Sequence, residues 1–163
     1  MEFLFDTANL GDIARYSEFY PITGVTTNPS ILKAEGNIDF FCHCKEIRKI
    51  IGFDKSLHIQ ILAEDCDGIL AEAEAILKNI DDKVYIKIPT TEQGLKAMRA
   101  LKAGGVGVTA TAIYTKIQGF MAIAIGADFI APYCNRMENM DIDPLQTLAA
   151  FAEIIAHTGS KTK

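Results

Sequence analysis

The sequence lacks several features that define whole classes of proteins. It has no run that approaches the roughly 18 apolar residues of a membrane helix. Its opening stretch, Met1–Asp6, has no positive charge ahead of an apolar run, so we expect no signal peptide. Basic residues are not in excess, because the formal net charge is −5 and the charges are scattered. These absences argue against nucleic acid or a membrane as partner and favour a cytoplasmic protein.

Signatures of nucleotide and metal binding are also missing. The chain contains neither a Gly-x-Gly-x-x-Gly fingerprint nor a Gly-Lys-Ser/Thr phosphate loop, which disfavours nucleotide binding. Its four cysteines, Cys42, Cys44, Cys66 and Cys134, show no Cys-x-x-Cys spacing. The segment Cys42-His43-Cys44 has metal-ligating residue types, but it falls within a predicted helix, where such close neighbours point in different directions. We therefore expect reduced cytosolic thiols.

What the sequence does contain is a regular alternation of strand and helix patterns, in 163 residues of 49% apolar composition. Strands are predicted over residues 3–6, 22–25, 57–62, 83–89, 106–111 and 128–133. Helices are predicted over residues 40–51, 65–80, 91–101, 115–125 and 143–155, after a first helical pattern through Ile13, Tyr16 and Phe19. Short links between them indicate an α/β protein with a parallel sheet. Either an open doubly wound sheet or part of an eight-stranded barrel fits this order.

Two segments near the C-terminus are expected to be irregular. Residues 134–143 are predicted to form a polar loop that holds Arg136. The last helix then begins at Asp143-Pro144, with aspartate as the N-cap and proline at the first helical position. The tail, residues 160–163, is expected to be frayed.

The segment Lys83–Pro89 carries the most informative side chain. It is a short apolar strand, yet Lys87 stands between two isoleucines close to the end of the strand. A lysine on a core strand is costly unless it is paired or neutral. Desolvation lowers the pKa of an amine, and a neutral amine is what Schiff-base chemistry on a carbonyl requires. The alternative interpretation is a snorkelling or salt-bridged lysine without catalytic function.

Polar residues gather at the ends of successive predicted strands. They are Asp6, Thr26 and Asn28, Gln60, Lys87, Thr111 and Tyr133. A single polar residue at such a position is usually the N-cap of the next helix. In a parallel barrel, however, the C-terminal ends of all the strands converge on one mouth, where chemistry takes place. The repetition around one lysine therefore favours a catalytic site.

Four motifs resemble those of the small transaldolases and fructose-6-phosphate aldolases. They are Phe5-Asp6-Thr7-Ala8-Asn9, Gly24-Val25-Thr26-Thr27-Asn28-Pro29-Ser30, Ile86-Lys87-Ile88-Pro89 and Ala131-Pro132-Tyr133-x-Asn135-Arg136. The match runs in order from Met1 to about residue 158. The resemblance implies a class I aldolase of the (β/α)8 TIM-barrel type that needs no metal or cofactor. It also implies phosphosugar and dihydroxyacetone-type substrates and a homo-oligomer.

The resemblance implies a role for each matching residue. Lys87 corresponds to the Schiff-base lysine and Asp6 to a carboxylate near it. Gln60 and Thr111 correspond to residues that hold the catalytic water, and Tyr133 to a proton-transfer group. The substrate-binding candidates are Asn28 and Thr26 for the donor and Arg136 for the phosphate, for which a permanently charged, bidentate guanidinium is well suited.

Two positions separate the subgroups of this family. Transaldolases usually have glutamate in place of Gln60 and phenylalanine in place of Tyr133, so this chain resembles the aldolases. We therefore expect reversible cleavage of fructose 6-phosphate to dihydroxyacetone and glyceraldehyde 3-phosphate. Two alternatives stay open: a transaldolase of the pentose phosphate pathway, or an inactive member that serves only as an oligomeric or binding protein.

The length of the chain departs from the family pattern. A (β/α)8 barrel usually needs roughly 200 residues or more. We expect one (β/α) barrel domain over residues 1–163 with about six βα units, lacking the last two. The first and sixth strands are then expected to keep unpaired edges that promote association, and turnover is expected to be poor.

Overall fold

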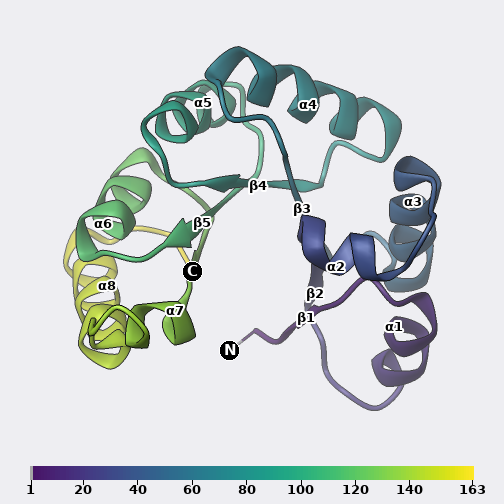
Figure 1. The fold of residues 1–163 in the computed structure, drawn as a ribbon, viewed down its shortest axis with the longest axis horizontal. Helices are drawn as coiled ribbons and strands as arrows, with labels where there is room; N and C mark the ends of the chain where they lie inside the picture. Colours follow the sequence, from purple (N-terminus) through teal and green to yellow (C-terminus); the bar gives the residue numbers. More distant parts are fainter. Residues whose placement is uncertain (1) are drawn as a thin grey trace. The chain divides into compact units, whose positions relative to one another are not determined.

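A computed structural model describes residues 2–163, which form two compact units. The first unit contains residues 2–62 and Ala71–Ile86, and the second contains Ala63–Leu70 and Lys87–Lys163. The strands follow one another in chain order, β1-β2-β3-β4-β5-β6, and helices alternate with them (Figure 1). None of the helices in residues 2–163 combines the length and the apolar character that crossing a membrane would require.

The first unit has a parallel sheet with helices packed beside it. Its complete elements are β1 (Leu4–Asp6), α1 (Leu10–Ser17), β2 (Gly24–Thr26), α2 (Pro29–Ala34), α3 (Phe40–Ile51) and β3 (Ser56–Gln60). Strand β2 pairs in parallel with both β1 and β3, and Thr26 is level with Asp6 on one side and His58 on the other. Helices α1 and α3 lie side by side (Figure 1), with Ile13 and Ile47 fully buried. Helix α4 (Cys66–Asn79) and β4 (Tyr85–Pro89) belong partly to each unit.

The predicted helix 40–51 is confirmed, and its ends follow from its flanking residues. Asp39 Oδ1 accepts the Cys42 backbone N–H at 2.8 Å, and this bond holds the pKa of the Asp39 carboxyl below its usual value. Gly52 ends the helix with a φ of 71°, a conformation that favours glycine. On the buried face, desolvation raises the pKa of the Cys44 thiol to about 12, which keeps this cysteine protonated and unreactive.

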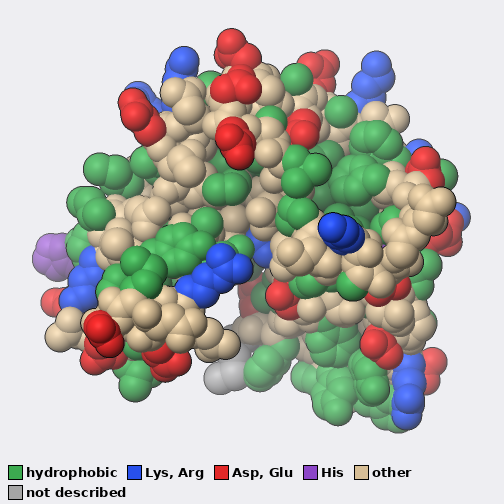
Figure 2. All heavy atoms as spheres, viewed as in Figure 1, with side chains coloured by type: hydrophobic (Ala, Val, Ile, Leu, Met, Phe, Trp, Pro, Cys, Tyr) green, Lys and Arg blue, Asp and Glu red, His purple; other side chains and the backbone are tan. Residues whose placement is uncertain are grey.

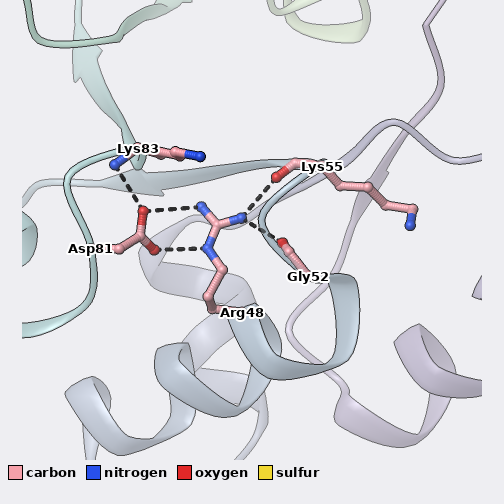
Figure 3. A network of polar contacts seen from close by, with 5 residues as sticks. All are labelled: Arg48, Gly52, Lys55, Asp81 and Lys83. Carbon is pink, nitrogen blue, oxygen red and sulfur yellow. Dashed lines mark hydrogen bonds and ion pairs between the residues drawn. The ribbon is translucent and has the colours of Figure 1, made fainter.

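A buried ion pair ties the end of α3 to the segment that precedes β4 (Figure 3). Arg48 Nε donates to Asp81 Oδ2 at 2.7 Å, and both side chains are more than nine-tenths buried. Arg48 Nη1 also donates to the carbonyl oxygens of Gly52 (3.0 Å) and Lys55 (2.7 Å). The Lys83 backbone N–H donates to Asp81 Oδ1 at 2.8 Å. One guanidinium therefore satisfies a buried carboxylate and two backbone carbonyls within the first unit.

The second unit continues the alternation of strand and helix. Its complete elements are α5 (Glu92–Ala103), β5 (Val108–Ile113), α6 (Lys116–Ile125), β6 (Phe129–Pro132), α7 (Cys134–Glu138) and α8 (Pro144–Thr158). Strands β5 and β6 pair in parallel, with a register shift between Thr111 and Ile113. Helix α6 approaches α8 closely at Gly119, where a Cβ atom would overlap the ring of Phe151. Figure 1 shows α6 and α8 together beside these strands.

The predicted polar loop over residues 134–143 is wrong in its first half. Residues Cys134–Glu138 form helix α7, so Arg136 lies on a helix. Met137 is fully buried, and its N–H donates to the Tyr133 carbonyl at 2.9 Å. Burial of this apolar side chain stabilises a helical turn in a segment whose polar composition indicated a loop. The predicted start of the last helix is confirmed, because Asp143 Oδ1 accepts the Gln146 N–H at 3.1 Å.

The prediction that the tail is frayed is also wrong. The Lys163 N–H donates to the Asp128 carbonyl at 2.9 Å, and the Ile130 N–H donates to the Lys163 carbonyl at 2.9 Å. The Thr162 hydroxyl donates to the Ala127 carbonyl at 2.7 Å and is buried. These bonds occupy part of the edge of β6. The sixth strand was expected to keep an unpaired edge, and the tail pairs with part of that edge.

Candidate active site

Lys87 is the central residue of β4, whereas the sequence pattern placed it close to the end of the strand. Its neighbours Ile86 and Ile88 are fully buried, and Lys87 itself is only 5% exposed. The strand ends at Pro89. The amine is therefore held on a short strand from which water is largely excluded.

Thr111 is a fully buried residue of β5, in the second unit. Thr90 follows β4 directly, and its N–H and hydroxyl both donate to the Thr111 carbonyl at 2.8 Å. The Thr111 hydroxyl is fully buried, and it has no hydrogen-bond partner among residues 2–163. Buried polar groups are nearly always paired, so this hydroxyl is positioned for a water molecule or a ligand.

Arg136 and Tyr133 lie together at the start of α7. The guanidinium carbon of Arg136 is 5.0 Å from the centre of the Tyr133 ring. Arg136 Nη1 donates to the Tyr114 hydroxyl at 3.3 Å, and the rings of Tyr114 and Tyr133 meet edge to face at 5.5 Å. No ion pair to Arg136 occurs in the part of the chain that the structure describes. Its positive charge is therefore available to an anionic ligand.

In Figure 2, basic side chains lie beside hydrophobic ones over α6, α7 and α8. Exposed apolar residues here include Ile117 on α6, Leu145 on α8, and Met140 between α7 and α8.

Asp6 and Thr26 are brought together in the first unit. They are level across the β1–β2 pair, and the Thr26 hydroxyl donates to Asp6 Oδ1 at 2.6 Å. Asn28 serves first as the N-cap of α2, because its Oδ1 accepts the Ile31 N–H at 2.9 Å. The cap engages Oδ1 and not the amide nitrogen. Gln60 ends β3, and its Oε1 atom is buried without a hydrogen-bond partner in the described chain.

Sequence reasoning missed three residues that support this site. Gln118 Oε1 accepts the N–H groups of Tyr114 and Thr115 at 3.0 and 3.1 Å, and Gln118 Nε2 donates to the Thr90 carbonyl at 3.0 Å. The spacing Thr115-x-x-Gln118 is a capping box and could have identified Gln118 as a structural residue. Tyr114 and Thr90 gave no comparable signal, because the contact of Tyr114 with Arg136 and the contacts of Thr90 join residues distant in sequence.

The described residues show no grouping for a metal ion. Within residues 2–163, no three His, Cys, Asp or Glu side chains gather as a ligand set. The cysteines Cys42, Cys44, Cys66 and Cys134 are all free.

Comparison with known proteins assigns the family. Residues 3–163 match the family described as Transaldolase/Fructose-6-phosphate aldolase. A protein from Streptococcus pneumoniae, described as a probable fructose-6-phosphate aldolase, is 47% identical over 163 residues, which cover 100% of this chain and 73% of that protein. A protein from Streptococcus equi subsp. zooepidemicus, described as a probable transaldolase, is 39% identical over 155 residues, which cover 95% of this chain and 71% of that protein.

Solved structures share the fold at low sequence identity. A dipeptide epimerase from Enterococcus faecalis matches with a TM-score of 0.64 and 12% identity over 99% of this chain, which spans just under half (46%) of that chain. An orotidine 5'-monophosphate decarboxylase from Methanocaldococcus jannaschii matches with a TM-score of 0.59 and 13% identity, over 85% of this chain and 74% of that chain. These likenesses concern the fold alone.

The expected fold class, a (β/α)8 TIM-barrel type with about six βα units present, is therefore confirmed. The expected enzyme class, an aldolase or a transaldolase, is confirmed by the names of the relatives. With the family match extending over residues 3–163, this chain belongs to the transaldolase/fructose-6-phosphate aldolase family.

Proposed function

We propose that this protein is a class I aldolase that cleaves fructose 6-phosphate reversibly to dihydroxyacetone and glyceraldehyde 3-phosphate. The observation that carries the proposal is Lys87, an amine only 5% exposed within β4 of a chain from this family. A site with little water favours the neutral, nucleophilic form of an amine. The relative at 47% identity, described as a probable fructose-6-phosphate aldolase, supports the same substrate.

The proposed reaction begins when Lys87 Nζ attacks the C2 carbonyl of fructose 6-phosphate. A C–N bond forms, water leaves, and an iminium ion results. A base removes the proton of the C4 hydroxyl, the C3–C4 bond breaks, and its electron pair moves into the iminium ion. Glyceraldehyde 3-phosphate leaves and an enamine remains on Lys87. Protonation of the enamine at C3 and hydrolysis by water then release dihydroxyacetone and restore the amine.

The other residues receive roles that suit their chemistry. We assign Tyr133 as the proton-transfer group, since its hydroxyl can both donate and accept a proton. Thr111 and Gln60 are each assigned to bind water, and within residues 2–163 each has a buried oxygen, Thr111 Oγ1 and Gln60 Oε1, without a hydrogen-bond partner. Asp6 is the carboxylate that assists proton transfer.

Substrate binding is assigned to three further side chains. Arg136 binds the phosphate, which is supported by its lack of a carboxylate partner in the described residues. Asn28 contacts the donor hydroxyls through its amide nitrogen, since Oδ1 is engaged by the Ile31 N–H. Thr26 is assigned to the donor together with Asn28, and its hydroxyl also donates to Asp6 Oδ1 at 2.6 Å.

A second candidate function is transfer of the dihydroxyacetone unit between two sugar phosphates. The relative described as a probable transaldolase, at 39% identity, favours it. Gln60 and Tyr133 favour the aldolase instead. A neutral amide at position 60 orients water but cannot accept its proton, whereas the tyrosine hydroxyl at position 133 can take part in proton transfer.

The assembly and location of the protein are also part of the proposal. We propose one catalytic domain that assembles as a homo-oligomer in the cytoplasm. Exposed apolar side chains such as Ile117 (59%) and Leu145 (77%) support association between chains, which sedimentation over a range of concentrations would detect. The free state of Cys42, Cys44, Cys66 and Cys134 supports a reducing compartment.

Product analysis separates these functions. The purified chain is incubated with fructose 6-phosphate, with and without erythrose 4-phosphate. An aldolase releases free dihydroxyacetone and glyceraldehyde 3-phosphate without an acceptor. Activity that depends on erythrose 4-phosphate, without free dihydroxyacetone, would establish the transaldolase. No reaction in either mixture would favour the inactive binding protein.

A further inference from the structure

Tyr114 links the end of β5 to the helix that carries Arg136. Its hydroxyl accepts a hydrogen bond from Arg136 Nη1 at 3.3 Å, while the same guanidinium lies over the ring of Tyr133 at 5.0 Å. The two tyrosine rings support each other edge to face at 5.5 Å. An arginine side chain has many rotamers, and Arg136 is exposed, so these two contacts restrict where its charge can lie.

The backbone of Tyr114 is itself held by the core of the second unit. Its N–H donates to Gln118 Oε1 at 3.0 Å, and Gln118 Nε2 donates to the Thr90 carbonyl at 3.0 Å. Thr90 in turn donates twice to the Thr111 carbonyl at 2.8 Å. These hydrogen bonds therefore run from Thr90, which follows β4, the strand of Lys87, to the backbone N–H of Tyr114, the residue whose hydroxyl contacts Arg136.

A backbone irregularity in β5 lies immediately before Tyr114. Ala112 has a φ of 52°, in the left-handed region that residues with a Cβ rarely adopt. The pairing of β5 with β6 shifts register at the same place, between Thr111 and Ile113. Such bulges change the direction of the side chains that follow, and they are frequent next to active sites. The register shift lies between the buried Thr111 and Ile113, the last residue of β5, which Tyr114 follows.

We propose that Tyr114 is a positioning residue that orients Arg136 toward the phosphate of the substrate, and so makes the enzyme select phosphorylated over neutral sugars. This inference rests on the proposed function. The hydroxyl accepts one N–H of the guanidinium and thereby directs the remaining N–H groups toward a dianion, whose oxygens can accept two of them at once. A neutral substrate makes no use of this arrangement.

The variant Tyr114→Phe tests the role, because it keeps the ring and its contact with Tyr133 and removes only the hydroxyl. We expect the KM for fructose 6-phosphate to rise about 3- to 10-fold, the effect of one lost hydrogen bond. We expect kcat to change less than about twofold, since the lost interaction is made equally in the ground state and the transition state. Cleavage of unphosphorylated fructose should keep its kcat/KM.

Thr158→Val is the matched control. It removes an exposed hydroxyl of α8, in the same unit, that donates to the Ile154 carbonyl at 2.7 Å. Its kinetic constants should equal those of the wild type with both sugars. If Tyr114→Phe weakens both sugars equally, or neither, the residue has only a packing role and the proposal is wrong.

Binding of inorganic phosphate tests the inference without turnover. Titration calorimetry should show weaker binding by Tyr114→Phe than by the wild type, and Thr158→Val should match the wild type. If the wild type cleaves no fructose 6-phosphate but shows this phosphate pattern, the proposed function fails and the role of Tyr114 stands. Equal phosphate binding by Tyr114→Phe and the wild type, or none by the wild type, overturns the role of Tyr114.

Discussion

Lys87 is a charged residue type at a position that packing would give to valine or isoleucine. It is flanked by the fully buried Ile86 and Ile88, and it is 5% exposed. This conflict between residue type and environment was visible in the sequence, because alternation along Lys83–Pro89 already placed the lysine within an apolar strand. Local rules break most often at functional positions, and this conflict is the reason the proposed function rests on Lys87.

Tyr133 provides a test of the proposed proton transfer. Tyr133→Phe keeps the ring on which Arg136 lies and removes the hydroxyl. We expect cleavage of fructose 6-phosphate to fall about 10²- to 10⁴-fold, the usual contribution of a general acid or base. The KM should change little, because phosphate binding by Arg136 is retained. Steady-state kinetics beside Thr158→Val measure the effect, and unchanged cleavage in Tyr133→Phe would count against the aldolase reading.

The supporting residues were harder to predict than the reactive ones. Reactive residues carry unusual chemistry in their own motifs, as Lys87 and Arg136 do. Tyr114 acts through a contact with Arg136, 22 positions away, and nothing in its local sequence indicates that contact. The left-handed conformation of Ala112 was also hidden, because a tertiary bulge and not a glycine or asparagine signal produces it.

At the scale of elements, the stability of the first unit depends on the pairing of Arg48 with Asp81. Arg48→Met leaves the Asp81 carboxylate buried without its cation and two carbonyl oxygens without a donor. We expect the free energy of unfolding to fall by about 3–5 kcal/mol. Urea denaturation followed by circular dichroism measures it.

An exposed pair on the same helix supplies the control. Lys49 pairs with Glu46, and their side chains are 70% and 49% exposed. Lys49→Met should cost less than about 1 kcal/mol, because water and salt screen such pairs. If Arg48→Met proves as mild as Lys49→Met, the network in Figure 3 contributes little and our account of α3 is wrong.

Elements with strong local signals were predicted well, and those fixed by distant contacts were not. The predicted helix over residues 40–51 coincides with α3, which Asp39 and Gly52 cap, and Asp143 with Pro144 starts α8 as predicted. Helix α7 was missed because it depends on burying Met137, and the tail was missed because it depends on bonds to Asp128 and Ile130. The polar composition of these two segments predicted a loop and a frayed tail, but tertiary contacts stabilise a helix in one and an ordered backbone in the other.

At the scale of the whole molecule, the order of motifs along the chain was the decisive signal. The four motifs resemble those of the family in the same order, and the family match extends over residues 3–163. Composition argued against nucleic-acid-binding and membrane proteins. The order of strands and helices did not by itself separate an open doubly wound sheet from a barrel. The fold class was settled by the family and by structural neighbours, with TM-scores of 0.64 and 0.59.

The central claim is that the intact protein forms a covalent imine with its substrate at Lys87. Sodium borohydride reduces an imine to a stable secondary amine, so the site can be mapped by peptide mass spectrometry after incubation with dihydroxyacetone or fructose 6-phosphate. We predict a reduced adduct on Lys87 that is absent without sugar and absent in Lys87→Arg, because a guanidinium stays protonated and cannot attack a carbonyl. An adduct on another lysine, such as Lys83, with Lys87 unmodified would contradict the account.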